Sequence, residues 1–256
     1  MKKLIFNLTL LVFISFASIL IILSTVGIKT NKFNNLISSK ASQNNNISLE
    51  LEKIKFKLNF KELNLFLETN KPKIKYRGIY IPVKNLKIYI DFLSLLKSKP
   101  KIQKTNIDLE ELDVEELNKL LVVIKPSNFR SLLKSKIKEG KLNSQIDLFL
   151  DNKGFLEDFI ARGSIKNLKA ELMNGLNFTQ TNFDFFADKN DILIKNVFGN
   201  LADVKISDGD IKLNLEKGIK LSSNFNSNLN FDEEKLNKYE RLLKKYTIAQ
   251  NLKNLK

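Results

Sequence analysis

Several short segments of the chain place an apolar residue at every second position. In 54–60, IKFKLNF, the residues between the apolar ones are lysine and asparagine, and similar alternation recurs at 86–92, 144–151 and 210–216. Successive side chains of a β-strand point to opposite faces of the sheet, so this period predicts strands with one apolar and one polar face.

Turn-forming residues separate the predicted strands between 142 and about 230. They are Asp-Asn-Lys-Gly at 151–154, Asp-Lys-Asn-Asp at 188–191 and Ser-Asp-Gly-Asp at 207–210. Short connections of this kind favour antiparallel hairpins, because parallel strands need a longer crossover. Residues 49–230 are therefore predicted to form a mainly antiparallel β domain.

Two helices are predicted to interrupt these strands, at 113–124 and 127–139. In the first, Asp113 and Glu116 have the spacing of a capping box, and leucine and isoleucine follow at i, i+3, i+4 and i+7. The second helix has its own apolar stripe, and Gly140 would end it.

Two other segments differ in composition from the predicted strands. Residues 29–48 are rich in asparagine and serine without a clear period, which predicts a linker. Residues 231–256 begin with acidic residues and place leucine and tyrosine on one stripe, which predicts a C-terminal amphipathic helix.

Residues 4–28 carry no charged side chain and are predicted to cross a membrane. As a helix they would be about 37 Å long, enough for a hydrocarbon core of about 30 Å. A cleavable signal peptide is the alternative, although its apolar core is normally shorter and is followed by small residues at the cleavage site. We favour an uncleaved anchor with a cytoplasmic tail at 1–3 and everything after Lys29 beyond the inner face.

The net charge of +15 comes from lysines spread along the whole chain. Nucleic-acid-binding proteins usually gather positive charge on one face or helix, so we expect no nucleic-acid partner. Diffuse lysines are better suited to an anionic membrane surface.

The chain contains neither cysteine nor histidine, which excludes thiolate nucleophiles, histidine bases and the commonest metal ligands. The acidic residues between Asp108 and Glu116 fit the start of a helix better than a metal site. The glycines are isolated and form no phosphate-binding loop. We therefore expect no enzyme, no cofactor and no metal.

The apolar strand faces could be buried in two ways. The sheet could pack on itself or on a second sheet, or it could stay open and be covered by other apolar material. A membrane anchor in the same chain favours the second arrangement, because acyl chains of lipids could supply that material.

Three stretches, preceded by the N-terminal hydrophobic segment, resemble the amino-terminal module of AsmA-like proteins: IPVKNLKIYIDFLSLLKSKPKIQKTNIDLEELDVEELNKLL at 81–121, GKLNSQIDLFLDNKGFLEDFIARGSIKNLKAEL at 140–172 and FDFFADKNDILIKNVFG at 183–199. The resemblance covers most of the chain, and it consists of alternation patterns with few fixed residues.

The resemblance implies an anchor in the inner membrane of a Gram-negative bacterium and a periplasmic domain. AsmA-like proteins are related to chorein-type bridge-like lipid transfer proteins, in which a strongly curved sheet forms a groove lined with apolar side chains. They are implicated in phospholipid traffic to the outer membrane, and the family brings no catalytic residues. Many members are much longer than 256 residues.

From the pattern and the resemblance together we predict a mainly β protein. A single transmembrane helix would precede a strongly curved antiparallel sheet that forms an open, taco-like groove at 49–230. The groove would bind or conduct phospholipid acyl chains between the two membranes in outer-membrane biogenesis. The alternative is a non-enzymatic envelope assembly scaffold that binds another envelope protein through a sheet edge or the C-terminal helix. The candidate groove residues are Ile54, Phe56, Leu58, Phe60, Ile88, Ile90, Phe92, Ile146, Leu148 and Leu150.

Overall fold

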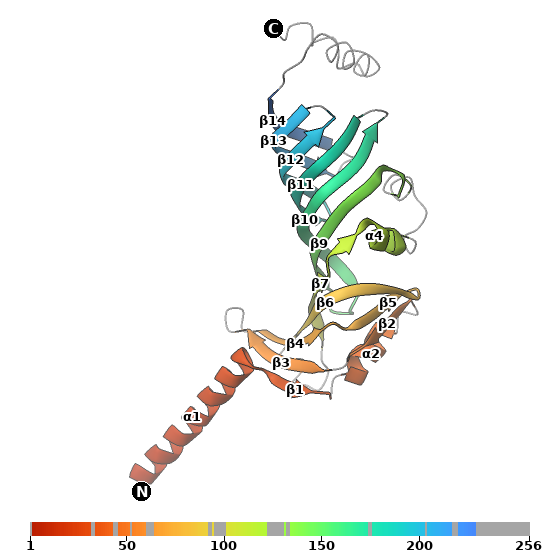
Figure 1. Cartoon of the computed structure of the whole chain (residues 1–256). Helices are drawn as coiled ribbons and strands as arrows, with labels where there is room; N and C mark the ends of the chain where they lie inside the picture. The colour runs from red at the N-terminus through yellow and green to blue at the C-terminus, as the bar shows by residue number, and fades with distance from the viewer. Residues whose placement is uncertain are drawn as a thin grey trace, which may run out of the picture.

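The protein is mainly β, with an apolar helix at its N-terminus and a large open antiparallel sheet (Figure 1). The computed structural model describes residues 2–31, 34–42, 46–51, 53–59, 64–91, 94, 101–121, 131, 134–173, 176–202, 204–216 and 220–228. The predicted helix at 231–256 lies outside this range, as do Phe60 and Phe92.

Helix α1 (Lys2–Thr25) extends away from the sheet (Figure 1). Residues Lys3–Thr25 are long and apolar enough to cross a membrane, and this segment is not buried against the protein. The helix ends three residues before the predicted boundary at 28, because Gly27 takes a left-handed φ of 75° and donates a backbone hydrogen bond to Ile22. The length and composition of α1 suit a membrane anchor or a signal sequence.

Eleven strands form the main path of the sheet, and every pair along it is antiparallel. In spatial order they are β1 (Ile28–Thr30), β3 (Ile54–Asn59), β4 (Asn64–Asn70), β6 (Ile79–Ile90), β7 (Ile102–Leu109), β9 (Ile137–Leu150), β10 (Leu156–Met173), β11 (Leu176–Asp188), β12 (Asp191–Leu201), β13 (Val204–Asn214) and β14 (Lys220–Asn228). The two outer strands of this path, β1 and β14, do not pair with each other, so the sheet is not closed into a barrel.

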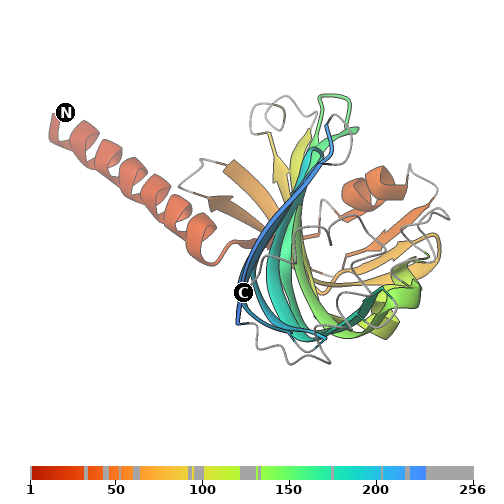
Figure 2. The same cartoon turned by 90° about the horizontal axis from the view of Figure 1, so that it is seen from above.

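The long strands bend, so the sheet is concave on one side. Figure 2 shows β9 to β14 following an arc when the molecule is viewed along the stacking direction. Figure 1 shows the same strands stacked one above another, with α1 at the opposite end from β14.

The buried core lies at the end of the sheet nearest α1. There the first four residues of β6 pair with β5 (Lys73–Tyr76), which in turn pairs with β2 (Ile47–Glu50). Helix α2 (Asn34–Ser42) packs next to β2. The cluster of buried side chains comprises Ile37, Leu49, Ile54, Leu67, Val83, Leu86, Ile88 and Ile90.

Strands β9 to β14 form a meander of hairpins, as the turn signals predict. In the turn at 151–154, the Asp151 carboxylate accepts hydrogen bonds from the backbone of Lys153 and Phe155 at 2.8 and 2.9 Å. Asp188 accepts two at 2.8 Å from the backbone of residues 190 and 191. Both predicted turns are therefore confirmed.

The third predicted turn, at 207–210, is wrong, because these residues continue β13. Gly209 pairs with Phe225 of β14, and the Phe225 ring occupies the space where a side chain on Gly209 would lie. A glycine covered by a cross-strand aromatic ring is compatible with a strand interior.

The linker prediction for 29–48 is also wrong. This segment contains the end of β1, all of α2 and the first residues of β2. Ile37 of α2 is 3% exposed and belongs to the core, so this asparagine- and serine-rich segment contributes a side chain to the packed end of the sheet.

The helical pair predicted at 113–139 is only partly correct. Helix α4 (Val114–Leu121) follows the two-residue strand β8 (Leu112–Asp113) and has the predicted capping box. The Glu116 amide donates to the Asp113 carboxylate at 2.8 Å, and the Asp113 amide donates to the Glu116 carboxylate at 3.1 Å. Residues 137–139, predicted to be helical, and Gly140, predicted to end that helix, belong instead to β9.

Candidate functional site: the apolar face of the sheet

The pairing register places most apolar strand residues on one face of the sheet. Directly paired residues of antiparallel strands share a face. Beginning at β9, the pairs Leu148 with Phe159, Ile165 with Phe183, and Phe185 with Ile194 carry this face from strand to strand. We name the following set the distal apolar face: Ile146, Leu148, Phe159, Ile165, Phe183, Phe185, Ile192, Ile194, Ile211, Leu213, Leu221 and Phe225.

The same face continues toward the N-terminus, where protein side chains cover it. Ile54, Ile88 and Ile90 are 1%, 5% and 4% exposed and belong to the cluster that includes Ile37 of α2. Figure 2 shows α2 on the side toward which the long strands curve, so the apolar face is the concave face. At this end of the sheet, other segments of the same chain cover the apolar face.

The prediction that the groove is open along its whole length is wrong at this end, where the core fills it. Ile54, Ile88 and Ile90 lie on the expected face, but α2 and β2 pack with them, so they do not line an open surface. Phe56 packs against the same core, and Leu58 pairs with Leu65 on that face and is half-buried. The sequence contained no strong signal for α2, and so gave no indication of what covers these strands.

The distal apolar face has much less protein packed against it. Of the elements in the described part of the chain, β10 to β14 pack mainly against their neighbours in the sheet, and α4 packs next to β9. Ile146, Leu148 and Leu150 are half-buried. At the last strand, Leu221 is 64% exposed.

The candidate residues chosen from the sequence missed most of this face. Phe183, Phe185, Ile192, Ile194, Ile211 and Leu213 all follow the alternation that identified the earlier strands. The pattern at 210–216 predicts a strand, and the same alternation identifies Ile211 and Leu213 as residues of its apolar face.

The opposite, convex face carries charged and amide side chains in paired arrangements. The Lys57 ammonium lies 2.6 Å from the Glu68 carboxylate, and Lys87 lies 3.8 Å from it. Burial raises the pKa of Glu68, but the hydrogen bond and charge of Lys57 outweigh it and hold the pKa below its usual value. These ion pairs place charged groups on the convex face, which also carries aromatic side chains such as Phe66 and Tyr89.

Asp147 is the most buried carboxylate of the convex face. It accepts a hydrogen bond of 2.6 Å from the Asn106 amide and lies 3.3 Å from the Lys104 ammonium and 3.6 Å from the Arg162 guanidinium. Burial of a carboxylate is tolerated when cations and donors surround it. The group therefore joins β7, β9 and β10 through their polar side.

The described residues contain no group of acidic side chains arranged to hold a metal ion. Comparison of the chain with family models, with curated proteins and with solved structures found no match. The protein is thus a β protein with a candidate membrane helix, and its curved sheet carries most of its apolar side chains on one face and most of its charged side chains on the other.

Proposed function

We propose that the protein binds phospholipid acyl chains on its distal apolar face and is an AsmA-like protein of the bacterial envelope. In this proposal α1 anchors the chain in the inner membrane, the sheet lies in the periplasm, and its concave side is an open groove through which lipid passes toward the outer membrane. One observation carries the proposal: a continuous apolar face over β9 to β14, in a chain that begins with an apolar helix.

The dimensions of this face suit an acyl chain. Six strands spaced about 4.8 Å apart extend over about 24 Å, whereas one leaflet of a bilayer has an apolar depth of about 15 Å. Each methylene removed from water contributes about 0.8 kcal/mol. A chain lying across the strands would therefore gain several kcal/mol while covering side chains such as Phe185 and Ile194.

Because of the core next to α1, the proposed path of the acyl chains differs from the groove predicted from the sequence. Because α2 and β2 occupy the concave side at β3, β4 and β6, acyl chains would contact the sheet from β9 onward. Lipid would enter beside this core rather than along the whole stack of strands.

Adjacent phenylalanines on β11 provide a matched test. Phe185 lies on the distal apolar face, while Phe186 pairs with Leu193 on the convex face and is exposed. The photoreactive residue p-benzoylphenylalanine would replace each in the full-length chain, in cells labelled with radioactive phosphate. We expect a lipid adduct from position 185 and at least tenfold less from position 186.

Equal labelling at the two positions, or none at position 185 in a folded protein, would refute lipid binding on this face. Positions 194 and 195 repeat the comparison on β12, because Ile194 shares the face of Phe185 and Lys195 does not. Agreement between the two strands would separate a face-specific result from a local one.

A second function, an assembly scaffold, is favoured by the edge of β14. This strand pairs with β13 on one side, and no pairing is present on its other side among the described residues. An edge strand can accept a further strand from another protein. The same photoreactive residue at Ser222, on the convex side of β14, would then yield a protein adduct while position 185 yields no lipid.

A further inference from the structure

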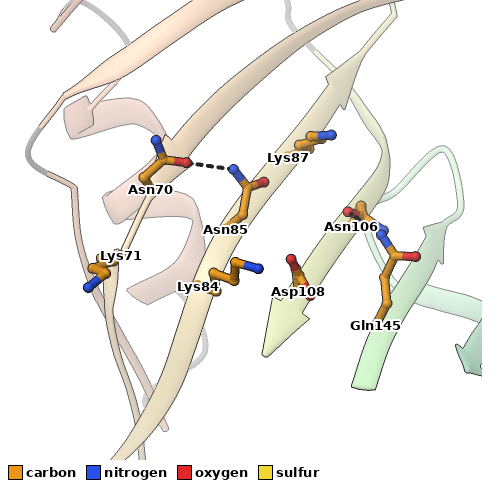
Figure 3. Close-up of a pocket in the computed structure, with 8 residues that line it drawn as sticks. All are labelled: Asn70, Lys71, Lys84, Asn85, Lys87, Asn106, Asp108 and Gln145. Carbon is orange, nitrogen blue, oxygen red and sulfur yellow. Dashed lines mark hydrogen bonds between the residues drawn. The ribbon is translucent and has the colours of Figure 1, made fainter. Parts of the chain in front are cut away.

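A polar hollow of about 510 Å³ opens on the convex face, where β4, β6, β7 and β9 lie next to one another (Figure 3). It is separate from the distal apolar face, because its lining side chains point to the other side of the sheet. Those side chains are amides, lysines and one carboxylate, so the hollow differs in chemistry from the acyl-chain surface.

An irregularity in β6 builds one wall of the hollow. The register shifts between the pairs Val83 with Leu109 and Asn85 with Asp108, so Lys84 is an extra residue in the strand. A bulge of this kind can place two consecutive side chains on one side of the sheet. Lys84 and Asn85 thus both line the hollow, and the Lys71 amide donates to the Lys84 carbonyl at 2.9 Å.

A chain of hydrogen bonds fixes the opposite wall. Arg162 Nε donates to Gln145 at 2.9 Å, Gln145 donates to Asn106 at 3.3 Å, and Asn106 donates to Asp147 at 2.6 Å. Figure 3 shows Asn106 and Gln145 side by side at the end of the hollow away from Asn70. Two of the lining amides are therefore held in place before any ligand binds.

Other lining groups lack the partners that their neighbours have. Within the described ranges, neither the Lys84 ammonium nor the Asp108 carboxylate makes an ion pair, although Lys57, Lys87 and Lys104 on the same face all do. The Asn85 amide donates to Asn70 at 2.7 Å and to Glu68 at 3.2 Å, but its buried carbonyl oxygen accepts no hydrogen bond from any described residue.

We propose that this hollow binds a phosphate monoester that carries hydroxyl groups, such as a phosphorylated polyol or sugar. A phosphate would pair with the Lys84 ammonium, because an unpaired cation beside amide donors suits an anion. Asp108 is acceptor-only when ionised, so it requires a donor from the ligand, and a hydroxyl group supplies one. A second hydroxyl group would donate a hydrogen bond to the unpartnered Asn85 carbonyl oxygen.

Glycerol 3-phosphate is the probe for this site, with inorganic phosphate and glycerol as its two halves. Isothermal titration of the full-length protein in a non-ionic detergent at low salt would compare the three. We expect glycerol 3-phosphate to bind at least tenfold more tightly than phosphate, and glycerol to show no binding. Lys84→Gln is expected to lower the affinity for glycerol 3-phosphate at least tenfold.

The Asp108→Ala variant tests the hydroxyl contact by the direction of its effect. Removing a carboxylate should leave inorganic phosphate binding equal or tighter, while the preference for glycerol 3-phosphate disappears. Lys189→Gln, in the exposed turn after β11, is the control for general charge and should leave binding unchanged.

Absence of binding, a loss with Lys189→Gln as large as with Lys84→Gln, or a preserved preference in Asp108→Ala would each overturn the site. Circular dichroism of each variant would verify that the sheet is intact. The result is independent of the lipid proposal, because the probe carries no acyl chain and the residues lie on the opposite face.

Discussion

Replacing one leucine with alanine at each end of the apolar face would test, by the loss of folding stability, which end is packed and which is exposed. Leu67 on β4 is 2% exposed and lies in the core, whereas Leu221 on β14 is 64% exposed. Leucine to alanine removes three carbon atoms, worth about 2.4 kcal/mol at about 0.8 kcal/mol for each buried one. The cavity left in a packed core raises the cost of Leu67→Ala to about 3–5 kcal/mol.

Leu221→Ala should cost much less, because only about a third of that side chain is removed from water. We expect about 1 kcal/mol or less. The assay is urea unfolding of the full-length chain in detergent, followed by far-ultraviolet circular dichroism. With a slope of about 2 kcal/mol per molar urea, the midpoint should fall by about 2 M for Leu67→Ala and by no more than about 0.5 M for Leu221→Ala.

Equal midpoint shifts for the two variants would refute the reasoning. They would mean that protein covers the distal face as tightly as α2 and β2 cover the proximal one. Acyl chains would then have no surface to occupy, and the lipid proposal would fall with the prediction.

Three further variants test the polar side of the fold. Asp113→Ala removes the carboxylate that accepts from the Glu116 amide, and a cost of about 0.5–2 kcal/mol is expected in the same unfolding assay. Glu68→Gln should make stability less sensitive to acid: the Glu68 pKa is lowered in the fold, so its contribution is present above the ordinary value of 4.5 and is lost as the pH falls below it. A wild-type midpoint that declines no more steeply than that of Glu68→Gln on acidification would contradict this. Asp147→Ala should cost about 1–3 kcal/mol, because the Asn106 amide loses its acceptor while the two cations can still reach water; an unchanged midpoint would show that the buried carboxylate contributes nothing.

The alternation in the sequence is sufficient to predict which residues of each strand share a face. Alternation predicts Ile54, Ile88 and Ile146 as apolar-face residues of their own strands, and the pairing register brings these faces together on one side of the sheet. This works because side chains alternate with a fixed period of two, and the charged residues between the apolar ones cannot be buried without partners.

What covers each face could not be predicted, because covering depends on contacts between distant segments. Ile37 lies in a stretch rich in asparagine and serine, yet it belongs to the same buried cluster as Ile54 and Ile88. Gly209 has the local signature of a turn, but it lies within β13, where it pairs with Phe225 of the neighbouring strand β14. The hollow beside Lys84 depends on a bulge that no periodicity reveals.

The meander from β9 to β14 allows the length of the sheet to change by the insertion or deletion of hairpins. Each strand there packs mainly on the one before and the one after it, so inserting or deleting a whole hairpin would leave the other pairings intact. Two strands change the height of the stack by about 10 Å and preserve chain direction and the side on which each side chain points. Related sheets could therefore differ in height by whole hairpins while their apolar side chains remain on one face and their charged side chains on the other.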